Sequence, residues 1–181
     1  MNLQKIQWKL FFKTPSEIKP DDFFRIFNTW IPGSEEIFVD VADYSHTHDG
    51  PVTLLVGHYL DYALDNTDLK LGFLYSHKQP LAGNNQEKLA ATLKRFLQAC
   101  QRLGMEFKTN EIFFQINDRA LAPSTPKTFA ALKPDLICFL DGIFTPGSYT
   151  LKPQNEPKKR FGILIKIKEN QSITDLITKI S

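Results

Sequence analysis

The sequence predicts one α+β domain over residues 1–181, in which helices pack on a mixed or mainly antiparallel sheet of about six to seven strands. Apolar segments of strand length are interspersed with four helical segments, and several strands follow one another directly. Hydrophobic residues make up 42% of the chain and charged residues 23%, a composition that excludes a disordered or fibrous protein.

The N-terminal segment predicts a strand followed by a short helix. Residues 4–13 alternate between apolar and polar side chains, and one side of this strand carries Ile6, Trp8, Leu10 and Phe12. Pro20 begins a helix that ends before Pro32 and Gly33. The apolar side of this helix is expected to carry Phe23, Phe24, Phe27 and Trp30.

Three consecutive strands are predicted next, and they suggest an antiparallel meander. Their ranges are 37–41, 52–56 (extended through Tyr59 and Tyr62) and 69–75. A long helix follows, which Asn84 caps, with Glu87 completing a capping box, and which ends at Gly104.

The C-terminal part predicts a strand at 111–116, a helix that starts at Pro126, a hairpin of residues 149–151 and 161–167, and a final short helix. Pro134 is expected to break or kink its helix, because an interior proline removes a hydrogen bond. Cys100 and Cys138 lie in apolar helical contexts, so we expect buried free thiols.

No apolar run reaches the roughly 18–20 residues that span a bilayer, and the N-terminus lacks the apolar segment of a signal peptide. We therefore expect a cytoplasmic protein without a membrane partner. The net charge of +2 is too small to indicate a nucleic-acid partner.

Charge is unevenly distributed along the chain. Residues 26–69 contain eight acidic residues and no lysine or arginine, so this span carries −8 and the rest of the chain carries +10. A basic C-terminal hairpin with Lys158, Lys159 and Arg160 can face this acidic span within the molecule or across a dimer.

The candidate site lies inside the acidic span, where a strand ends and a connection begins. The residues expected to form a ligand or partner surface are Asp40, Asp43, Tyr44, His46, His58, Asp61 and Tyr62. Histidine and aspartate together also suit a divalent metal, and the candidate ligands are Asp43, His46, His48 and His58. This metal site requires strand pairing that returns His58 near Asp43.

Several segments resemble an uncharacterised bacterial protein family. They include residues 37–46, 50–51 and 56–58, the tripeptide Asn117-Asp118-Arg119, and Arg160-Phe161-Gly162. The resemblance covers nearly the whole chain and implies no activity.

Three functions stay open at this point. The first is a noncatalytic binding or interaction protein that uses the acidic surface at residues 40–65, with a homodimer as one form of that interaction. The second is a small metal-dependent hydrolase with the same Asp and His ligands, and the third is a nucleic-acid contact through the basic hairpin.

Overall fold

The structure, a computed structural model, describes residues 1–154 and 156–180. Its strands form one eight-stranded sheet of order β2-β3-β4-β5-β1-β6-β8-β7, in which all neighbours are antiparallel. The strands are β1 (Ile6–Phe12), β2 (Phe38–Asp43), β3 (Pro51–Gly57), β4 (Leu60–Asp65), β5 (Gly72–His77), β6 (Phe107–Ile116), β7 (Tyr149–Pro153) and β8 (Gly162–Ile167). The helices are α1 (Pro20–Trp30), α2 (Asn85–Leu103), α3 (Pro126–Asp141) and α4 (Ile173–Lys179), with short 3-10 turns at Pro15–Glu17 and Thr67–Leu69.

The predicted α+β class is confirmed, but the sheet has eight strands rather than six to seven. The extra strand arises because the chain does not run straight from Val52 to Tyr62. It turns at His58 and Tyr59, so β3 and β4 pair as a hairpin. A Cβ at Gly57 would lie 2.4 Å from the Leu60 carbonyl oxygen, which makes glycine necessary at this tight turn.

Three smaller predictions are wrong in part. α3 continues through Pro134 to Asp141, so the helix does not break at this proline. Phe24 is 40% exposed, and it does not share the buried side of α1 with Phe23. Cys100 and Cys138 are free thiols as expected, but Cys138 is exposed.

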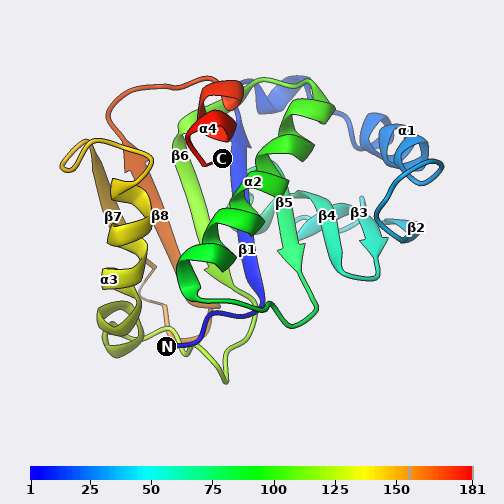
Figure 1. The fold of residues 1–181 in the computed structure, drawn as a ribbon. Coiled ribbons are helices and arrows are strands. Elements are labelled where there is room, and N and C mark those ends of the chain that lie inside the picture. Colours follow the sequence, from blue (N-terminus) through cyan, green and yellow to red (C-terminus); the bar gives the residue numbers. More distant parts are fainter. Residues whose placement is uncertain (155, 181) are drawn as a thin grey trace.

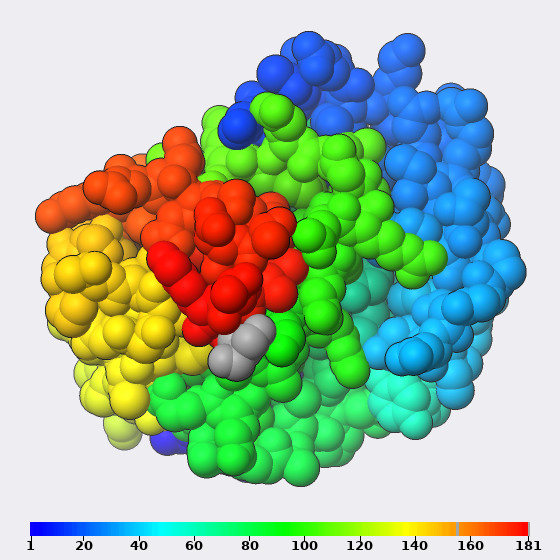
Figure 2. Space-filling model, turned by 45° about the horizontal axis from the view of Figure 1, so that its top comes forward, coloured from blue at the N-terminus to red at the C-terminus, as the bar shows by residue number. Residues whose placement is uncertain are grey.

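The helices gather on one face of the sheet (Figure 1). α2 crosses β1 and β5 on this face, α3 lies in front of β7 and β8, and α4 packs against α2. Figure 2 shows the red C-terminal residues filling the space between the green and yellow segments. Among the described helices, none combines the length and apolar character needed to cross a bilayer.

The core lies between the sheet and these helices. The four predicted apolar residues of β1 are all at most 1% exposed on this side. The Trp8 Nε1–H donates to Thr92 Oγ1 of α2 at 2.9 Å, which satisfies the buried indole. Because side chains alternate along a strand, the intervening residues of β1 point to the opposite face of the sheet.

Candidate functional site

Strand pairing separates the candidate metal ligands. Asp43 lies opposite Thr53 at one end of the β2–β3 pair, whereas the His58 N–H donates to the Ile37 carbonyl at the other end. At about 3.3 Å per residue, the six steps from Ile37 to Asp43 span about 20 Å. The prediction that strand pairing brings His58 close to Asp43 is therefore wrong.

The segment around Asp43 is held by its own local hydrogen bonds. Asp43 Oδ1 accepts from the Ser45 N–H at 2.8 Å, and hydrogen bonds from Ser45 lower the pKa of the Asp43 carboxyl. Tyr44 and His46 are exposed neighbours, and the His48 carbonyl accepts from Asn66 Nδ2. In residues 1–154 and 156–180, no three His, Cys, Asp or Glu side chains are grouped to hold a metal, so a bound divalent metal stays an untested prediction.

The acidic span does not present one continuous acidic surface. Four of its carboxylates pair with cations from elsewhere in the chain, in the pairs Glu36–Arg95, Asp61–Lys78, Asp65–Lys9 and Asp68–Lys159. Asp40 and Asp43 remain exposed on β2. The predicted contact between the acidic span and the basic hairpin is confirmed within the molecule, because Lys159 Nζ lies 2.7 Å from Asp68 Oδ1.

Tyr62 is the one candidate surface residue that is buried. It is 5% exposed and stacks on Phe73 with ring centroids 5.4 Å apart. Its alternation with Leu60 and Leu64 puts its ring on the helix-covered face, so the ring packs in the core rather than on an exposed acidic surface. Asp61, its neighbour, points to the opposite face.

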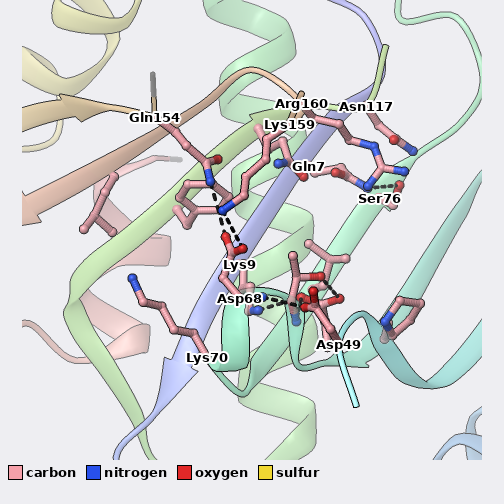
Figure 3. Close-up of a pocket in the computed structure, with 18 of the residues that line it drawn as sticks. Gln7, Lys9, Asp49, Asp68, Lys70, Ser76, Asn117, Gln154, Lys159 and Arg160 are labelled. Atoms are coloured by element: carbon pink, nitrogen blue, oxygen red, sulfur yellow. Dashed lines mark hydrogen bonds and ion pairs between the residues drawn. The ribbon is translucent and has the colours of Figure 1, made fainter. Parts of the chain in front are cut away.

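That opposite face contains a groove of about 1170 Å³ (Figure 3). Its floor is built from the outward-facing side chains of the central strands. The apolar part of the floor consists of Phe11, Leu54, Ala63, Leu74, Phe113 and Leu164. The polar part includes Gln7, Lys9, Ser76 and Gln115.

A buried ion pair lies in the floor. Lys9 Nζ is 2.6 Å from Asp65 Oδ2, and both side chains are 4% exposed. Burial lowers the pKa of Lys9 from its ordinary value, although the Asp65 carboxylate opposes this shift. Thr67 Oγ1–H also donates to Asp65 at 2.8 Å, so the carboxylate has a second partner.

Two loops meet over this floor and form what we call the loop bridge, residues Asp68, Gln154 and Lys159. Asp68 accepts from Lys159 at 2.7 Å and from Gln154 Nε2 at 3.3 Å (Figure 3). The two loops start from opposite ends of the strands. The loop that carries Asp68 ends at Gly72, which pairs with Phe11. The loop that carries Gln154 and Lys159 ends at the β6–β8 pair, at the end near Gln7.

Asp68 is positioned for this contact by an unusual backbone. Asp68 and Leu69 have φ values of +61° and +56°, a left-handed conformation that non-glycine residues rarely adopt. The Asp68 N–H donates to Asp49 Oδ1 at 2.8 Å, which holds this turn over the groove. Hydrogen bonding by Lys159 lowers the pKa of Asp68.

The groove rim is positively charged once the internal ion pairs are counted. Five lining cations form no ion pair with any carboxylate in the described part of the chain: Lys70, Arg119, Lys152, Lys158 and Arg160. Asp49 is the lining carboxylate without such a partner within the same residues. The groove therefore combines an apolar floor with an uncompensated basic rim.

The charge distribution that identifies the acidic span does not predict the groove. Gln7 and Lys9 were visible as the polar positions of the first predicted strand, but alternation alone does not distinguish a solvated face from a binding face. No protein-family model matches the chain, and no curated protein matches it either. The resemblance to an uncharacterised bacterial family thus stays a prediction.

Proposed function

We propose that this chain is a noncatalytic binding protein that holds a ligand with an apolar body in the groove on the helix-free face of the sheet. The observation that carries the proposal is the groove itself, about 1170 Å³ in volume, with six apolar side chains on its floor and a loop bridge above it. Ligand sites are commonly apolar concavities with a few placed polar groups.

The chemistry of the floor favours binding over catalysis. Lys9 and Asp65 neutralise each other at 2.6 Å, so neither is free to act as a base or nucleophile. None of the four histidines, all of which lie in the described part of the chain, lines the groove. His77 lies on the other face, with Nδ1 2.9 Å from the Tyr75 hydroxyl.

This site replaces the acidic surface as the centre of the binding hypothesis. Asp61 and Asp65 of the acidic segment line the groove, but both are paired with lysines. The exposed Asp40 and Asp43 lie on β2 at the sheet edge and outside the groove lining. A homodimer through that edge stays a prediction.

The test uses N-phenyl-1-naphthylamine, a neutral fluorophore that brightens in apolar surroundings. We expect saturable binding to the folded protein. Leu74→Trp, which adds an indole to the middle of the floor, should weaken binding at least about tenfold, the effect of removing roughly 1.4 kcal/mol. Val39→Trp is the matched control, because Val39 is 63% exposed and lies outside the groove.

Thermal melts of both variants check that the fold is retained. The proposal is wrong if the wild-type chain shows no saturable binding, or if Leu74→Trp and Val39→Trp bind equally well.

A nucleic-acid contact is the second candidate, because Lys152, Lys158 and Arg160 of the basic hairpin are unpaired within the described residues and line a groove that also contains Phe11 and Phe113. Bases stack on such aromatic rings, and phosphate contacts are salt-dependent. Fluorescence anisotropy with a labelled 12-nucleotide single-stranded RNA at 50 and 200 mM salt tests it. Binding that is absent at both concentrations removes this candidate.

A further inference from the structure

Polar and basic side chains from four segments converge at one end of the groove. Gln7, Ser76, Asn117 and Arg160 lie together there, at the end farther from Lys70 (Figure 3). Strand pairing explains the convergence: Gln7 lies opposite Ser76 on β5 and opposite Gln115 on β6.

Backbone hydrogen bonds position Asn117 and Arg160 at this end of the groove. The Asn117 N–H donates to the Lys5 carbonyl at 2.9 Å, and the Ile116 N–H donates to the Phe161 carbonyl at 3.0 Å. These bonds place the chain after β6 and the chain before β8 at the same end as Gln7. Arg119 follows in the same turn and also lines the groove.

Gln7 carries an unsatisfied polar atom at this end. The residue is 5% exposed, and its Nε2 donates to Ser76 Oγ at 2.9 Å, while Oε1 has no hydrogen-bond partner among the described residues. The two ends of an amide are interchangeable in assignment, and a serine hydroxyl can donate as well as accept. In either orientation one buried amide atom is left for a ligand group, since an unsatisfied buried polar atom is costly.

The charges at this end are unequal. The Arg119 and Arg160 side chains are exposed and form no ion pair with any carboxylate in residues 1–154 and 156–180. Asp61, opposite Ser76, is the acid that lines this end, but its Oδ1 lies 2.8 Å from Lys78 Nζ and accepts from the Gly57 N–H at 3.0 Å. Asp118, in the turn with Arg119, lies outside the groove lining, and its Oδ1 accepts from the Ala120 and Leu121 N–H groups at 2.9 Å. The charge of the Asp61 carboxylate is therefore neutralised by Lys78, whereas the guanidinium groups of Arg119 and Arg160 have no such partner within the described residues.

We propose that this end of the groove is an anion subsite that binds the carboxylate or phosphate head of the ligand, whose apolar body lies along the floor. Arg160 and Arg119 supply guanidinium groups, whose planar arrangement of donors matches either oxyanion. Gln7, with its amide turned so that Oε1 accepts from Ser76, supplies a buried N–H donor. This assignment rests on the binding function proposed above.

The test compares two probes that differ by one sulfonate: 8-anilinonaphthalene-1-sulfonate and its neutral parent, N-phenyl-1-naphthylamine. At 150 mM salt, the sulfonate probe should bind the wild-type chain about tenfold more tightly, as expected for a charge-assisted contact. Arg160→Gln should remove most of this advantage and leave the neutral probe unchanged. Gln7→Leu should weaken the sulfonate probe about threefold or more, and thermal melts check that the fold is retained.

Lys127→Gln, which removes an exposed positive charge on α3 outside the groove, is the matched control and should leave both probes unchanged. Displacement of the sulfonate probe by 1-naphthoate and by 1-naphthyl phosphate then distinguishes the two head groups. Equal affinity of the wild-type chain for both probes would overturn the subsite, as would equal losses for both probes in Arg160→Gln. Either result would leave the groove itself intact, whereas failure of the neutral probe to bind counts against the proposed function.

Discussion

Removing one member of the Lys9–Asp65 pair should destabilise the protein far more than removing both. Both side chains are 4% exposed and their charged atoms are 2.6 Å apart. Leaving one buried charge without its partner costs about 3–5 kcal/mol, whereas replacing a buried pair with apolar residues of similar size is often neutral or stabilising. We expect Lys9→Met and Asp65→Leu each to lose about 3–5 kcal/mol, and the double variant to fall within about 1 kcal/mol of the wild-type chain.

The two single variants should differ in their pH dependence. In Asp65→Leu, the buried Lys9 loses the partner that favours its charged form, so its folded-state pKa falls further below its unfolded value. The unfolded state then binds more protons than the folded state, and the stability of this variant should rise as the pH increases from 7 towards 10.5. Lys9→Met should lack this rise, because it has no lysine at this position.

Urea denaturation of the four proteins at pH 7 and pH 9.5 measures these differences. Single variants within about 0.5 kcal/mol of the wild-type chain would refute the reasoning, since a pair this deeply buried cannot be lost at so little cost. A double variant that loses the sum of both single effects would refute it as well. If the double variant is stable but binds the neutral probe poorly, the pair is retained for the ligand rather than for the fold.

Three further predictions concern other parts of the molecule. Burial lowers the pKa of His77 to about 4. The folded state should therefore lose stability as the pH falls from 6.5 towards 4, where the unfolded state gains the proton first. His77→Gln should flatten this part of a pH series of urea denaturation curves. Asn84→Ala, which removes the capping box of α2, should lower the free energy of unfolding by about 1 kcal/mol, whereas Asn28→Ala on α1 should have little effect. Lys159→Met removes the shorter of the two contacts of the loop bridge, so stopped-flow release of the neutral probe should accelerate while stability changes by less than about 1 kcal/mol. Unchanged release would show that the Lys159–Asp68 contact does not gate the groove.

Much of the secondary structure follows from local patterns. The alternation of Ile6, Trp8, Leu10 and Phe12 predicts a strand because side chains of a strand point alternately to two faces. Asn84 with Glu87 predicts the start of α2, since both residues satisfy backbone groups within one turn. The turn at His58 is not predicted, because the apolar residues on both sides of it continue the strand pattern. Gly57 is the one local indication of this turn, since only glycine fits against the Leu60 carbonyl oxygen.

The candidate site was harder to predict, because it depends on which strands lie side by side. The concentration of acids in residues 26–69 is visible in the chain, but its pairing with Lys9, Lys78 and Lys159 is not, since these lysines are distant in sequence. The separation of Asp43 from His58 likewise depends on the register of β2 and β3.

The sequence by itself determined the fold class, the order of most helices and strands and the uneven distribution of charge, because each depends on neighbouring residues. Only the tertiary structure decided that Gln7, Ser76 and Arg160 share one end of a groove and that two loops meet above Lys9. The physical reason is that β1 pairs with β5 and β6 rather than with its neighbours in the chain. Strand order and register bring these distant segments together, and no local pattern of residues specifies them.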